Sequence, residues 1–190
     1  LLVGSMFFIY FVTNPLLVYW CIRKNPYPLI LHCLKKSAIT AFFTRSSAAN
    51  IPVNMELCKK LGLDEDTYSI SIPLGATINM DGTAIYQGIC AIFIASCYGI
   101  HLTLSQMLTI VLTATLASIG TAGVPGAGMV MLAMVLTSVG LPVDGIALVA
   151  GVDRIFDMGR TTVNITGDAA CTMVVSNLEA KKEARKAKIK

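Results

Sequence analysis

A single polar stripe interrupts a chain that otherwise avoids charge. Asp81 is the only Asp, Glu, Lys or Arg between Thr67 and Pro142, whereas five charged residues follow within residues 153–168. An α-helix turns about 100° per residue, which places four of these five charges and one amide within an arc of about 80°. Charged side chains inside a membrane helix are costly and mark ion or substrate pathways, so we expect function to lie here. The members of this polar stripe are Asp153, Asp157, Arg160, Asn164 and Asp168.

The composition indicates a membrane protein. Of the 190 residues, 55% are hydrophobic and 14% are charged, against about 25% charged residues in a typical soluble domain. Leu1 to Ile22 contains no charge and is long enough to cross a bilayer. Its length and the lack of an initiator Met or basic lead argue against a signal peptide. We therefore expect further helices upstream of Leu1.

The basic residues set the expected orientation. Most of the fifteen Lys and Arg fall in four clusters: Arg23-Lys24, Lys35-Lys36, Lys59-Lys60 and the tail from Lys181 to Lys190. This is the pattern of the positive-inside rule, which places basic clusters in the cytoplasm beside anionic lipid headgroups. Contact with the lipid bilayer thus accounts for the net charge of +4, and we expect no nucleic-acid binding and a cytoplasmic C-terminus.

Glycine, proline and polar residues divide the first half of the chain into three segments. Residues 1–24 are predicted to be a transmembrane helix. Residues 25–66 are predicted to be a re-entrant hairpin on the cytoplasmic side, because both flanks are basic and each arm is too short to span. Its tip is expected at Arg45 to Asn50. Residues 67–100 are predicted to be a broken transmembrane helix that unwinds at Asn79-Met80-Asp81-Gly82-Thr83, where it must line a cavity or lie buried in protein.

The second half repeats this plan from the opposite side. Residues 101–142 are predicted to be a second re-entrant hairpin on the outer side. Its tip at 120–128 holds four glycines and one proline, which will not keep a helix. Residues 143–178 form the striped helix, from about Asp144 to Ser176, and 179–190 the basic cytoplasmic tail. The expected fold class is an all-α membrane protein with two opposed re-entrant helical hairpins, one broken and one polar-striped transmembrane helix, as in secondary transporters.

The charges of the stripe indicate a class of ligand. One interpretation is a structural salt bridge between Asp157 and Arg160 at i, i+3 spacing. One arginine cannot neutralise three aligned carboxylates, however, so a metal ion or a ligand ammonium is expected to supply the missing positive charge. Arg160 offers a planar fork for a ligand carboxylate, and together these features describe an amino acid with an acidic side chain. The oxygens of residues 79–83 suit Na⁺.

Four long motifs follow one another along the chain. They are Thr44-Arg-Ser-Ser47, Pro73-Leu-Gly-Ala-Thr-Ile-Asn-Met-Asp-Gly-Thr83, Gly120-Thr-Ala-Gly-Val-Pro-Gly-Ala-Gly128 and Asp157-Met-Gly-Arg-Thr-Thr-Val-Asn-Ile-Thr-Gly-Asp168. With these motifs the whole chain resembles the dicarboxylate/amino acid:cation symporters, the family of the excitatory amino acid transporters and the archaeal aspartate transporters. The resemblance implies a mobile transport domain, alternating access in the cell membrane without an enzymatic reaction, and a homotrimer held by a scaffold upstream of Leu1.

The resemblance also implies roles in substrate binding. Arg160 would hold the side-chain carboxylate of the substrate and Asp157 its ammonium group, while Asn164 and Ser47 would meet its main-chain carboxylate. The other residues expected around the substrate are Arg45, Ser46, Thr83, Val124, Gly128, Asp153 and Thr161.

Three sodium sites are implied in the same way. The ligands of the first would be Gly75, Asn79, Asn164 and Asp168. The second would use the backbone carbonyls of Thr77, Ser118, Ile119 and Thr121, near Met80. Asp81 would belong to a third site whose other ligands lie upstream of Leu1. The second hairpin would be the gate, closing after substrate and sodium arrive.

Several alternatives remain open at this stage. The tip sequence Ser46-Ser47-Ala48-Ala49 is more like that of bacterial serine/threonine symporters, but those lack an arginine at the position of Arg160. A C4-dicarboxylate such as succinate has no ammonium group for Asp157, so aspartate or glutamate is favoured. An intramembrane aspartyl protease would need Gly-x-Gly-Asp, and Gly167-Asp168 lacks the first glycine. A structural or channel-forming subunit would need no Arg/Asp pair shaped to a substrate.

Overall fold

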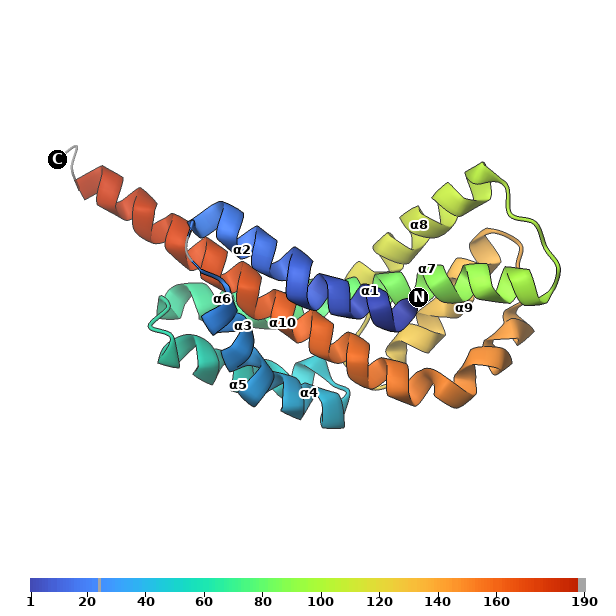
Figure 1. Ribbon diagram of the computed structural model, residues 1–190, viewed down its shortest axis with the longest axis horizontal. Helices are drawn as coiled ribbons and strands as arrows, with labels where there is room; N and C mark the ends of the chain where they lie inside the picture. The colour runs from blue at the N-terminus through green and yellow to red at the C-terminus, as the bar shows by residue number, and fades with distance from the viewer. Residues whose placement is uncertain (24, 188–190) are drawn as a thin grey trace.

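A computed structural model describes residues 1–23 and 25–187, and these residues form helices and no strand (Figure 1). The predicted all-α class is therefore confirmed. Lys24 and residues 188–190, which belong to the predicted basic clusters, lie outside the described residues.

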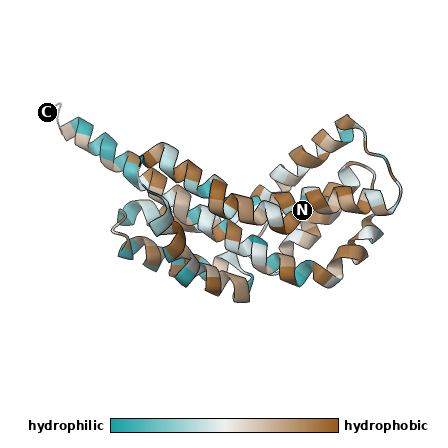
Figure 2. Ribbon diagram, viewed as in Figure 1, coloured by the Kyte–Doolittle hydropathy of each residue, from teal (hydrophilic) through white to brown (hydrophobic). Residues whose placement is uncertain are grey.

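The longest element is α10, Ile146–Ala187, which follows the short 3₁₀ turn Val143–Gly145. It runs along the whole molecule, and helices of both hairpins pack against it (Figure 1). The prediction that this helix ends near Ser176 is wrong, because the tail continues it to Ala187. Ion pairs one turn apart, Lys182 with Glu179 and Lys186 with Glu183, support a helix that is hydrophilic at this end (Figure 2).

The N-terminal helix is continuous but locally widened. It consists of α1 (Leu2–Phe8), the π-helical turn η1 (Ile9–Thr13) and α2 (Asn14–Ile22). The π-turn lies just before Pro15, which has no N–H to donate to the preceding turn. The helix ends at Arg23, whose φ of 60° is left-handed.

The first hairpin has a short tip. Its first arm comprises α3 (Tyr27–Cys33), the π-turn η2 (Leu34–Ala38) and α4 (Ile39–Thr44), and its second arm is α5 (Ser47–Lys60). Arg45 ends α4 with a left-handed φ of 54°, and the Ser46 hydroxyl then accepts from the Ala49 N–H at 3.1 Å. Because this N-cap starts α5 at once, the prediction of a break from Arg45 to Asn50 is wrong.

The broken helix is interrupted over two residues. α6 (Glu65–Ile78) begins at an Asp64 cap, and α7 (Asp81–Cys97) follows the non-helical Asn79 and Met80. Asp81, Gly82 and Thr83 already belong to α7, so the predicted unwound stretch is too wide at its C-terminal end. The break thereby brings the C-terminus of α6, the N-terminus of α7 and the side chains of Asn79 and Met80 against α10.

The second hairpin consists of α8 (Leu104–Ile119) and α9 (Ala127–Ser138), joined by the glycine-rich residues 120–126. α8 packs on α7 and α9 and leaves one apolar face uncovered (Figures 1 and 2). Such a face is unfavourable in water and suits lipid or a protein partner. Two helical stretches, Leu2–Ile22 and Glu65–Cys97, are also long and apolar enough to cross a membrane. The exposed apolar residues of α8 are Leu104, Leu108, Val111, Leu112 and Leu116.

Candidate functional site

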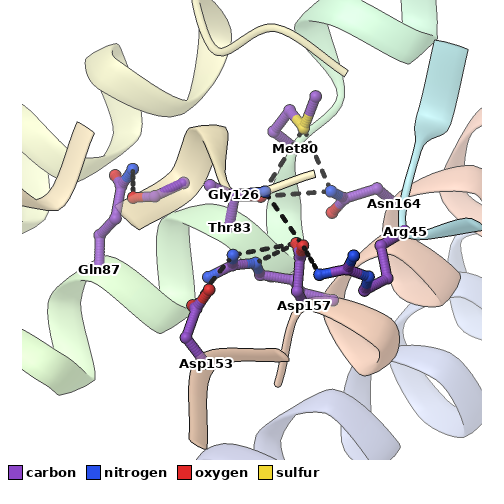
Figure 3. Close-up of polar contacts among 10 residues, drawn as sticks. Arg45, Met80, Thr83, Gln87, Gly126, Asp153, Asp157 and Asn164 are labelled. Atoms are coloured by element: carbon purple, nitrogen blue, oxygen red, sulfur yellow. Dashed lines mark hydrogen bonds and ion pairs between the residues drawn. The ribbon is translucent and has the colours of Figure 1, made fainter. Parts of the chain in front are cut away.

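All five residues of the polar stripe are buried, at no more than 5% exposure, whereas Arg154 on the same helix is exposed. The helical spacing therefore places the stripe correctly. The stripe faces the break between α6 and α7 and the tips of the two hairpins. Side chains of the stripe form hydrogen bonds and an ion pair with residues there (Figure 3).

Arg160 is fixed by neighbours on two sides. Its Nη2 lies 2.9 Å from Asp157 Oδ1 and 3.2 Å from Asp153 Oδ1, and its Nε donates to Asp157 Oδ1 at 3.1 Å. The guanidinium carbon lies 4.0 Å from the centre of the Tyr86 ring, a cation–π contact. Nη1 is buried and has no hydrogen-bond partner among the described residues, so one edge of the fork is available to a ligand carboxylate.

Asp157 lies where three elements converge. Its Oδ2 accepts from the Gly126 N–H at 3.1 Å and lies 3.8 Å from Arg45 Nη1 on the first hairpin (Figure 3). Gly126, with a φ of 80°, is the N-cap residue of α9, so the positive end of that helix also faces the carboxylate. These contacts hold the Asp157 side chain at the point where an ammonium group of a ligand could meet it.

The charge balance differs from the one expected from the stripe alone. Arg45 supplies a second guanidinium, so Asp153 and Asp157 are matched by Arg160 and Arg45. Asp168 forms no ion pair with any described residue. The surplus negative charge therefore belongs to Asp168 and is not spread along the stripe.

A small cavity lies between the two hairpin tips. It offers about 10 Å³ to the centre of a water-sized sphere, roughly the space of one water molecule, so an amino acid can enter only when the tips separate. Most of the residues expected around the substrate line it. The lining residues are Arg45, Ser47, Met80, Thr83, Thr121, Ala122, Gly123, Val124, Gly128, Asp157, Arg160, Thr161 and Asn164.

Asn164 joins this cavity to the break in the α6/α7 helix. Its Oδ1 accepts from the Gly82 N–H at 2.8 Å, and its Nδ2 lies 3.3 Å from Thr83 Oγ1 and 3.2 Å from Met80 Sδ. Met80, expected near the second sodium, therefore also borders the cavity. These bonds fix the orientation of the amide on the cavity wall.

Ser46 and Asp153 are near the cavity but do not line it. The Ser46 hydroxyl donates to the Gly123 carbonyl at 2.7 Å, and the Ala48 N–H donates to the same carbonyl at 3.1 Å. Ser46 thus holds the two tips together, while Asp153 contacts Arg160.

The residues of the first expected sodium site are brought together. The Asn79 amide donates to Asp168 Oδ1 at 3.0 Å and to the Asn164 carbonyl at 3.2 Å, and Gly75 lies against Asp168. Amide hydrogens here face the same oxygens that a small cation would use, and an amide can turn its oxygen toward that cation. One carboxylate with amide and carbonyl oxygens is a donor set that fits Na⁺.

The second expected site lies where α6 and α8 end. Thr77 is in the last turn of α6, Ser118 and Ile119 close α8, and Thr121 follows. Helix C-termini carry unpaired carbonyls and partial negative charge, although the Ser118 carbonyl already accepts from the Thr121 N–H at 3.2 Å. Asp81, assigned to the third site, is exposed at the start of α7.

Replacing Gly75 with alanine should weaken sodium binding. A Cβ at this position would lie 2.6 Å from Asp168 Oδ1, so the carboxylate must shift from the position in which it accepts the Asn79 hydrogen bond. Overpacking of this kind typically costs about 1–3 kcal/mol, and we expect the sodium concentration for half-maximal substrate binding to rise roughly tenfold. Gly88→Ala on α7 is the control, because its Cβ would meet no atom within 4 Å; equal effects of the two changes would contradict this placement.

Some residues of the site were missed by the sequence analysis. Tyr86 follows Thr83 by three residues and therefore shares its helix face, which is a signal that could have placed it beside Arg160. Gly126 donates through its backbone, and Ala122 and Gly123 line the cavity without polar side chains. Such contributions depend on the loop conformation.

A buried, charge-balanced pocket between two hairpins of a helical membrane chain is typical of a secondary transporter. The family model described as the sodium:dicarboxylate symporter family matches residues 1–178, and the chain belongs to this family. The family assignment made from the motifs is confirmed. Membership places the chain in a membrane, among symporters that move a small-molecule substrate with Na⁺ as the coupling ion.

Proposed function

We propose that the cavity binds an acidic amino acid, aspartate or glutamate, and that the chain forms the mobile transport domain of a sodium-coupled symporter. The observation that carries this proposal is the buried Asp157–Arg160 pair, which meets the tips of both hairpins. It offers an anion for an ammonium group and a guanidinium edge for a carboxylate.

Two charged groups of such a substrate would each find a partner of opposite charge in the cavity. When the tips separate, a zwitterion can insert its ammonium group beside Asp157 and its side-chain carboxylate beside Arg160 Nη1. A neutral amino acid would leave that buried nitrogen without an acceptor, and a dicarboxylate would bring a second anion toward Asp157. Groups left unpaired in a buried site are unfavourable, so both classes should bind more weakly.

Asn164 supports a direct coupling between substrate and sodium. Its side chain borders the cavity, while its carbonyl accepts from Asn79 beside Asp168. Sodium at Gly75, Asn79, Asn164 and Asp168 therefore orders one wall of the substrate site. By linkage, sodium raises the affinity for substrate and substrate raises the affinity for sodium to the same extent.

The second hairpin is proposed to be the gate. The Gly123 carbonyl at its tip accepts hydrogen bonds from the tip of the first hairpin, and the Gly126 N–H donates to Asp157. A small displacement of the second tip would break these bonds. We also propose that both hairpins are re-entrant in the membrane, that the six segments keep their predicted order with the striped helix extended to Ala187, that the C-terminus is cytoplasmic, and that a scaffold upstream of Leu1 forms a homotrimer.

Competition for binding tests the proposed substrate. With sodium in excess, L-aspartate or L-glutamate should displace bound substrate at concentrations at least about tenfold below those of L-serine or succinate, because each of these lacks one of the paired charged groups. The measurement is displacement of L-[³H]aspartate from the purified protein. Stronger displacement by serine would favour a neutral amino acid symporter, and stronger displacement by succinate a C4-dicarboxylate symporter.

A further inference from the structure

A second buried polar cluster lies inside the first hairpin. Its members, here called the polar triad, are Ser37, Asn50 and Asn54, and each side chain is at most 1% exposed. Polar groups are unfavourable in such an interior unless they are hydrogen-bonded, so the bonds that they form define what the triad does.

Ser37 orients the amide of Asn54. Its hydroxyl donates to Asn54 Oδ1 and accepts from Asn50 Nδ2. Ser37 lies in the π-turn η2, a distortion that is frequent at functional positions. With its oxygen held in this way, Asn54 directs its Nδ2 to the Ile165 carbonyl of α10 at 2.9 Å.

The hydrogen bond from Asn54 to Ile165 reaches the turn of α10 that contains Asn164 and Asp168, two residues of the first proposed sodium site. Ile165 follows Asn164, whose carbonyl accepts from Asn79, and the same turn ends at Asp168, which also accepts from Asn79. Side chains therefore hold this turn from two elements: Asn79 at the end of α6 and Asn54 on α5.

The triad retains an unfavourable feature. Asn50 Oδ1 is fully buried and has no hydrogen-bond partner among the described residues. An unpaired buried amide oxygen destabilises the folded state, and apolar side chains of similar size often pack such an interface at least as stably. This favours a positioning role over a purely stabilising one.

We propose that Asn54, oriented by Ser37, is a positioning residue for sodium. It fixes the turn from Asn164 to Asp168 against the first hairpin and so sets the sodium affinity of the site at Asp168. The inference rests on the proposed function, in which Asp168 and Asn79 bind sodium.

Sodium titrations of substrate binding test this role in the purified protein. Asn54→Leu should raise the sodium concentration for half-maximal L-aspartate binding roughly fivefold, as expected for the loss of one buried hydrogen bond. The aspartate Kd at saturating sodium should change by less than about twofold. Ser37→Ala should act in the same direction but less strongly, and Ser37→Thr, which keeps the hydroxyl, should restore the wild-type midpoint. Asn14→Leu, at a buried amide whose Nδ2 has no partner among the described residues, should not shift it.

A purely structural triad would give a different pattern. A lower melting temperature for Asn54→Leu with an unchanged sodium midpoint would overturn the proposal, as would an equal loss of aspartate affinity at saturating sodium. If Asn54→Leu does not fold, the Ser37 pair decides, and identical midpoints for Ser37→Ala and Ser37→Thr would reject the role.

Failure of the proposed function can be distinguished from failure of the role proposed for the polar triad. If Asp168→Asn keeps the wild-type sodium midpoint, the sodium site itself is misplaced. If Asp168→Asn shifts it and Asn54→Leu does not, only the role of the triad fails. Should the wild type prefer L-serine or succinate, the same titrations are performed with that probe.

Discussion

Replacing Arg160 with cysteine should abolish binding and uptake of acidic amino acids. The guanidinium is the group proposed to hold the side-chain carboxylate, and a hydrogen bond to a charged group contributes about 1.5–3 kcal/mol. Loss of the fork should therefore weaken aspartate binding roughly a hundredfold or more. We expect the smaller, uncharged side chain to admit neutral amino acids instead. The measurement is competition of L-aspartate and L-serine for binding to the variant.

The experiment on Arg160→Cys must separate a loss of substrate recognition from a loss of folding. Without Arg160, Asp153 loses its only ion-pair partner among the described residues, while Asp157 keeps Arg45, and an unpaired buried charge costs several kcal/mol. Arg160→Lys is the matched control, because it retains the positive charge but lacks the planar fork. It should fold like the wild type and still bind aspartate weakly. Unchanged aspartate affinity in Arg160→Cys would refute the assignment of the substrate site.

Replacing Asp168 with asparagine should have the largest effect on sodium dependence. The two side chains have the same shape, and asparagine can still accept the Asn79 hydrogen bond, so the change removes little besides the charge. Opposite unit charges about 4 Å apart attract by about 4 kcal/mol at the dielectric constant usual for protein sites. We therefore expect the sodium midpoint for substrate binding to rise well over tenfold.

The stripe offers a matched control for this change. Asp153→Asn also removes one buried carboxylate from α10, but Asp153 contacts Arg160 and not the proposed sodium ligands. It should alter aspartate affinity more than sodium dependence. If substrate binding by Asp168→Asn keeps the wild-type sodium dependence, the sodium site does not lie here.

Helical periodicity made much of the site predictable. The spacing of Asp153, Asp157, Arg160, Asn164 and Asp168 determines that these residues share one face, and the scarcity of charge elsewhere indicates that the face is buried. Glycine and polar residues likewise located the interruption at Asn79 and the tip of the second hairpin.

Contacts made across the fold were not predictable in the same way. The approach of Arg45 to Asp157 depends on a left-handed residue at a hairpin tip, and it changed the balance of charge assigned to the stripe. The polar triad is not predictable in this way, because Ser37 lies in a stretch whose composition predicts an apolar arm, and the sequence around Asn50 predicts the hairpin tip. Its significance depends on a bond to Ile165, far away in the sequence.

Sodium-driven uptake of L-[³H]aspartate into proteoliposomes tests the central claim most directly. An inward sodium gradient should drive accumulation of aspartate above its external concentration, and replacing external sodium with choline should abolish it. Accumulation that is independent of sodium would contradict the account. So would the accumulation of L-serine or succinate under the same gradient while aspartate remains outside.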